Sequence, residues 1–91
     1  MDGIGAPAIW PEMWYLAQHL LDGSLVVGLE EIASAIRLLA QRNSIIAEGA
    51  GAASVAAALA GKAGDGKVVC VVSGGNIDTS KLVKIFQGKV P

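Results

Sequence analysis

The segment best equipped for chemistry is Ser73-Gly74-Gly75-Asn76, which stands between an apolar run and a helix-like stretch. Paired glycines let a backbone approach a ligand closely, and successive backbone N–H groups can form a concave anion-binding nest. Ser73 adds a neutral hydroxyl and Asn76 adds an amide. The pattern predicts a ligand site at Ser73, Gly74 and Asn76. An ordinary glycine turn remains the alternative, because a lone Ser-Gly-Gly-Asn narrows the chemistry very little.

A second candidate is Glu48, which stands between the apolar Ile45-Ile46-Ala47 and an alanine-rich stretch. Its carboxylate is either a partly buried site residue or, the more ordinary interpretation, a cap at the start of the next helix. Residues 49–54 superficially imitate a dinucleotide-binding fingerprint. However, Ser54 takes the third small position, and no acidic residue follows at the required distance in a strand. Close helix packing explains these small residues better.

The remaining polar residues form no catalytic or metal-binding pattern. His19 stands one step from an apolar helix face, far in sequence from any cysteine or acidic cluster, so we interpret it as a surface or boundary residue. Trp10 and Trp14 have helical spacing and are interpreted as packing residues, with an interface as one possible location. Neither a metal-ligand spacing nor a Ser–His–Asp arrangement is present. We therefore predict no metal site.

These candidates need a scaffold, and the sequence predicts alternating helices and strands. Helices are predicted at residues 10–21, 29–42, 49–60 and 79–87, and strands at residues 24–27 and 67–72. The run at 67–72 is apolar at each interior position, which is typical of a central parallel strand covered on both faces. The predicted class is therefore α/β, with few parallel strands flanked by helices. Two strands make no self-sufficient sheet, so the chain is expected to be incomplete alone.

The composition is unusually apolar for a short chain. Hydrophobic residues make up 53% of the 91 residues, and charged residues only 16%. A domain of this size exposes much of its surface, so it cannot hide so many apolar side chains by itself. The composition predicts an interior piece of a larger protein or one subunit of an obligate oligomer.

Charge and cysteine content exclude several classes of protein. The net charge is −1 and the basic residues are scattered, which argues against a nucleic-acid partner. The longest uncharged run, residues 49–61, is too short to span a bilayer, so no membrane partner is expected. Cys70 stands alone and the first residues do not have a signal-peptide pattern, which together favour a cytoplasmic location.

Two ordered motifs carry a resemblance to a known family. Ala47-Glu48-Gly49-Ala50-Gly51-Ala52-Ala53 is followed further along by Val69-Cys70-Val71-Val72-Ser73-Gly74-Gly75-Asn76-Ile77-Asp78. Together they resemble the C-terminal part of the threonine/serine dehydratases, type II pyridoxal-phosphate (PLP) enzymes whose relatives include serine racemase. Asp2-Gly3-Ile4 and residues 25–42 also fit the family's pattern. The similarity therefore covers nearly the whole chain.

The resemblance implies that residues 1–91 form a single C-terminal fragment of the large domain of a type II PLP enzyme. It implies that Ser73 lies against the pyridine nitrogen of PLP, with Gly74, Asn76 and Glu48 close to the cofactor pocket. A neutral hydroxyl does not enforce a protonated pyridinium, which suits β-elimination. The reaction implied is the deamination of threonine or serine to a 2-oxo acid.

The sequence also departs from the family. The family's Schiff-base lysine lies in a Ser-x-Lys-x-Arg-Gly motif, and none of the five lysines here has that context. The family's glycine-rich phosphate cradle is absent as well. We therefore expect no catalytic residue in this chain, no activity and no bound PLP when it is alone. The expected partner is a second copy or a missing N-terminal portion that carries the lysine. A non-catalytic oligomerising module and a small-anion-binding protein are the alternatives.

Overall fold

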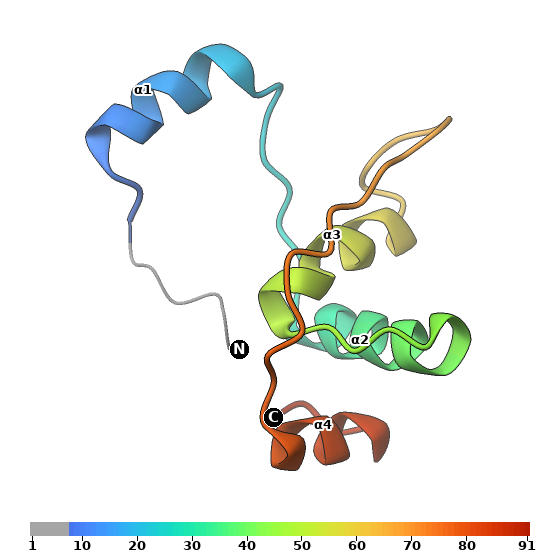
Figure 1. The fold of residues 1–91 in the computed structure, drawn as a ribbon. Helices are drawn as coiled ribbons and strands as arrows, with labels where there is room; N and C mark the ends of the chain where they lie inside the picture. Colours follow the sequence, from blue (N-terminus) through green and yellow to red (C-terminus); the bar gives the residue numbers. More distant parts are fainter. Residues whose placement is uncertain (1–7) are drawn as a thin grey trace.

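The computed structural model describes residues 8–91, in which four α-helices are the regular elements. They are α1 (Pro11–Leu20), α2 (Leu29–Asn43), α3 (Gly49–Leu59) and α4 (Thr79–Phe86). Helix α2 packs against both α3 and α4, whereas α1 stands apart from this three-helix body (Figure 1). Asp2-Gly3-Ile4, part of the family resemblance, lies outside the described residues.

The helices begin where their sequences favour a helix start. Pro11 occupies the first position of α1, where its missing N–H costs nothing, and Glu12 follows in the first turn. Glu30 and Glu31 lie in the first turn of α2 and Arg42 in its last, as the helix dipole favours. Local sequence therefore explains the helical elements well.

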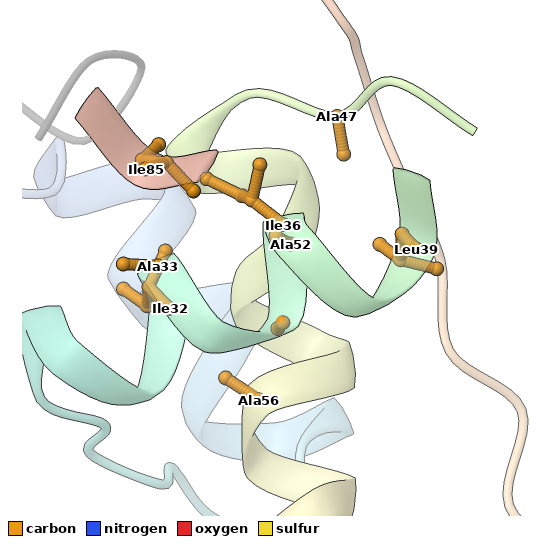
Figure 2. Packing of buried hydrophobic residues seen from close by; sticks show 9 residues of the cluster. Ile32, Ala33, Ile36, Leu39, Ala47, Ala52, Ala56 and Ile85 are labelled. Carbon is orange, nitrogen blue, oxygen red and sulfur yellow. The ribbon is translucent and has the colours of Figure 1, made fainter. Parts of the chain in front are cut away.

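The hydrophobic core lies between α2, α3 and α4 and is small. Its largest fully buried side chains are Ile36 of α2 and Ile85 of α4, which lie side by side in Figure 2. The whole cluster is Ile32, Ala33, Ala35, Ile36, Leu39, Ala47, Ala52, Ala56 and Ile85. Because five of these nine side chains are alanines, α2 and α3 approach closely but bury little apolar area.

The predicted α/β class is wrong for this chain, because the described residues contain no β-strand. Residues 67–72 are extended, but no neighbouring strand supplies the backbone partners that a sheet requires. Their alternate side chains differ: Cys70 and Val72 are half-buried, whereas Val69 is 92% exposed and Val71 is 73% exposed. The run that predicted a strand covered on both faces is therefore covered on one face only.

The second predicted strand, residues 24–27, is also an unpaired extended segment, which leads from α1 into α2. It is held by one lysine from beyond the end of α3. Lys62 Nζ donates a hydrogen bond to the carbonyl oxygen of Val26 and lies 3.6 Å from the carboxylate of Glu31. A side chain, and not a β-ladder, thus fixes this segment to the body.

None of the described helices is both long and apolar enough to cross a membrane.

Candidate functional site

The candidate site lies where the start of α3 meets residues 73–76. The amide of Glu48 donates a hydrogen bond of 3.0 Å to the carbonyl oxygen of Gly74. A side-chain carbon built on Gly51 would stand 2.4 Å from that same oxygen. The first turn of α3 and the Ser73–Asn76 loop are therefore in direct backbone contact. Two motifs that are distant in sequence thus meet at one place.

The second glycine of the loop also lies against backbone. A side-chain carbon on Gly75 would stand 2.3 Å from the carbonyl oxygen of Ile46, in the extended segment that precedes α3. Gly75 of the loop, and Gly51 opposite Gly74, are therefore needed for close packing within the chain. This finding agrees with the interpretation of Gly74-Gly75 as an ordinary glycine turn. It leaves the side chains of Ser73 and Asn76 as the groups that can face a ligand.

Glu48 occupies the N-cap position of α3, but its side chain makes no capping hydrogen bond. The half-buried carboxylate instead lies over the loop, with Oε1 3.1 Å from the point where a Gly74 side chain would begin. The interpretation of Glu48 as a side-chain cap is therefore wrong. The structure brings Glu48 and Gly74 together.

Ser73 and Asn76 are exposed, and no hydrogen bond within residues 8–91 engages the Ser73 hydroxyl or the Asn76 amide. The loop thus offers one neutral hydroxyl and one amide beside a carboxylate. A phosphate next to Glu48 would meet like charge, whereas a neutral or weakly basic ring nitrogen would not. The donor set consequently suits a polar aromatic ring better than a free anion.

The segment before the loop is held against α3 by contacts that the sequence did not predict. Ser54 Oγ donates a hydrogen bond of 2.9 Å to the carbonyl oxygen of Val71. Cys70 Sγ donates in return to the carbonyl oxygen of Ser54, at 3.6 Å. The available signal was the spacing of Gly51 and Ser54, which puts two small residues on one face of α3. Cys70 and Ser54 are therefore structural residues that hold the segment before the Ser73–Asn76 loop against α3.

The described chain provides no second reactive centre. None of its His, Cys, Asp and Glu residues group into a set that could hold a metal ion. Lys62 lies beyond the C-terminal end of α3, whereas Gly74 lies at the N-terminal end. The 11-residue helix puts about 16 Å between these ends. Lys62 is also engaged by Val26 and Glu31, so its role is structural.

The fold and site together define a small helical unit that presents a polar, glycine-rich loop. A family model described as pyridoxal-phosphate dependent enzyme matches residues 1–74, and the chain belongs to this family. The match includes Glu48, Ser73 and Gly74, and it ends just before Gly75 and Asn76. The resemblance predicted from the sequence is therefore confirmed.

Two similar proteins are the L-threonine dehydratase catabolic TdcB of Staphylococcus aureus strains USA300 and N315. They are 37% and 38% identical to this chain, over 94% of its length. The chain spans only 26% of each relative. It thus resembles part of a PLP-dependent threonine dehydratase. No solved structure matches the chain significantly.

Proposed function

We propose that this chain supplies the face of a PLP site that holds the pyridine ring, within a lyase of the threonine dehydratase type. The observation that carries the proposal is the unengaged hydroxyl of Ser73, on a loop fixed by the contact between Glu48 and Gly74. Family membership supports PLP as the cofactor. The proposed substrate is threonine or serine, and the proposed product is the 2-oxo acid formed by deamination.

The residues present fit one end of the cofactor. Ser73 would hydrogen-bond the pyridine nitrogen, and Asn76 and the Gly74 backbone would help to hold the ring. Bound PLP supplies the electron sink for elimination, and a neutral hydroxyl at its nitrogen leaves that sink weaker than a carboxylate would. The carboxylate of Glu48 disfavours phosphate at this end. The phosphate is therefore proposed to lie away from Glu48, on residues outside this chain.

The reactive lysine is proposed to come from a partner. No lysine of this chain has the family's lysine motif, and Lys62 is engaged in structural contacts. The partner proposed here is the lysine-bearing portion of a family enzyme. A second copy of this chain would add no such lysine. The small-anion alternative has less support, because the Glu48 carboxylate lies against the loop that would form the nest.

A chimera tests the proposal. In it, this chain replaces the matched region of the Staphylococcus aureus dehydratase, and formation of the 2-oxo acid and PLP absorbance are measured. Ser73→Ala should lower turnover about tenfold, which corresponds to a rise of about 1.4 kcal/mol in the activation free energy. The matched control is Ser80→Ala, an exposed serine in α4. Equal turnover in the two variants would remove Ser73 from the site. The chain alone should form no 2-oxo acid on addition of PLP and threonine.

A further inference from the structure

Helix α1 has an apolar face that nothing in the described chain covers. None of its residues is buried, and it makes no contact with α2, α3 or α4. At helical spacing, one side of the helix gathers large apolar residues. These are Met13 and Trp14, each 54% exposed, and Leu20, 77%, together with the flanking cap residues Trp10, 76%, and Leu21, 66%. Figure 1 shows α1 projecting from the body at the end of a long connection.

The molecule as a whole is more open than a globular protein of its mass. Its accessible surface is 6563 Å², whereas a folded monomer of 9.2 kDa exposes about 4,900 Å². The excess of roughly 1,600 Å² is twice the ~800 Å² that each partner buries in a standard protein interface. The radius of gyration, 14.0 Å, also exceeds the ~12 Å expected for this length. The exposed area is therefore of the size that a permanent interface covers.

The connection between α1 and α2 is fixed where it meets α2, although α1 itself is uncovered. Val27 packs against the core, and the carbonyl oxygen of Val26 accepts the hydrogen bond from Lys62. The amide of Gly28 then donates to Glu31 Oε1 at 3.0 Å. Because three successive residues are held, the connection leaves the body at a defined point. A partner that binds α1 therefore binds a helix whose connection to the body is already fixed next to α2 and α3.

The family match bears on which partner could cover α1. The family match runs from residue 1 to residue 74, so α1 is part of the family's architecture and not an addition to it. The described chain has nothing over α1, and the chain accounts for only 26% of its relatives. We infer that the apolar face of α1 docks into an apolar groove of the lysine-bearing portion of a family enzyme. The identity of that portion rests on the proposed function.

The chemistry of the face fits such a groove. An amphipathic helix binds by laying residues spaced three and four apart into a hydrophobic groove. Trp10 and Trp14 have this spacing, and tryptophan is among the residues that dominate binding energy at interface centres. Tyr15 and His19 lie on the other side of α1, where the His19 ring contacts the Tyr15 carbonyl oxygen at 2.8 Å. One face therefore binds and the other faces water.

Capture by the partner portion tests the inference. The Staphylococcus aureus dehydratase without its matched region is tagged and co-expressed with this chain, and the amount of chain retained is measured. Trp14→Asp should reduce capture at least tenfold, and His19→Asp, on the opposite face, should leave it unchanged. Neither substitution disturbs the core, because α1 contacts no other helix in the described chain. Equal capture of the two variants, or no capture of the unsubstituted chain, would contradict the docking.

A second measurement does not depend on whether the partner portion folds alone. In the chimera, Trp14→Asp should lower the thermal midpoint clearly more than His19→Asp does, and equal midpoints would overturn the inference. Trp10 and Trp14 are the only two tryptophans of the chain, so emission from the chain alone reports on α1 and its start. A blue shift of this emission with concentration would make a second copy the occupant instead. Neither measurement uses turnover, so an inactive chimera with docked α1 would refute the proposed function and leave the docking intact.

Discussion

Gly51 and Gly74 lie so close that a methyl group on Gly51 would stand 2.4 Å from the Gly74 carbonyl oxygen. The same oxygen accepts the hydrogen bond from the Glu48 amide. The start of α3 therefore contacts the Ser73–Asn76 loop through backbone atoms. Because backbone cannot rotate away as a side chain can, the loop's position depends on the absence of a side chain at residue 51.

Gly51→Ala should destabilise the chain by about 1–3 kcal/mol, the usual cost of forcing extra atoms into a packed site. Alanine ordinarily gains up to about 1 kcal/mol over glycine inside a helix, but a 2.4 Å contact with backbone outweighs this gain. Gly23→Ala is the control, since a side-chain carbon there meets nothing within 4 Å. Urea unfolding followed by circular dichroism measures both. A Gly51→Ala variant as stable as Gly23→Ala would mean that the loop moves aside freely.

Ser54→Ala tests the fastening between α3 and residue 71. The substitution removes the 2.9 Å hydrogen bond to the Val71 carbonyl, and a bond of this kind contributes about 0.5–1.5 kcal/mol. Ser34→Ala is the matched control, because Ser34 is an exposed helical serine and shows the propensity gain alone. The expected result is a lower midpoint for Ser54→Ala than for Ser34→Ala. Identical urea midpoints would assign the bond no net contribution.

The helices were predictable from sequence because local signals specify them. Pro11, the acidic pair Glu30 and Glu31, and the alanine content of α3 each act within one or two turns. The predicted helix at residues 29–42 accordingly agrees with α2, Leu29–Asn43, to within one residue. The family resemblance implied that Glu48 and Gly74 both lie close to the cofactor pocket, but their contact with each other was not predicted.

The sheet was not predictable in the same way. Val69 and Val71 have the composition of strand residues, but a strand also needs a neighbour, and the apolar pattern of one segment does not reveal whether one is present. The role of the loop glycines was likewise hidden. The close approach of Ile46 to Gly75 is a tertiary contact, and sequence alone could not distinguish it from an approach by a ligand.

Arg37→Met should loosen α4 from the body. Arg37 Nε donates a hydrogen bond of 3.0 Å to the carbonyl oxygen of Ile85, in the last turn of α4. A bond from a charged donor contributes about 1.5–3 kcal/mol, and methionine keeps most of the side chain's apolar stem. Arg42→Met, an exposed arginine in the last turn of α2, is the control and should lose less. Hydrogen exchange of the α4 amides should accelerate in Arg37→Met alone. Equal exchange rates in both variants would show that Arg37 does not hold α4.

The lowered pKa of Glu31 should make the stability of the fold depend on pH. The hydrogen bond from the Gly28 amide, helped by the positive charge of Lys62, lowers the pKa of Glu31 below its ordinary value of 4.5. A lowered pKa in the folded state means that the stabilising contribution is fully present above about pH 4.5 and is lost as pH falls through the folded value. Thermal midpoints from pH 7 to pH 3 should therefore fall less steeply in Glu31→Gln than in the unsubstituted chain. Glu30→Gln, next to it on α2, should keep the steeper fall. A Glu31→Gln profile parallel to the unsubstituted one would show that the contact of Glu31 with Gly28 and Lys62 does not stabilise the fold.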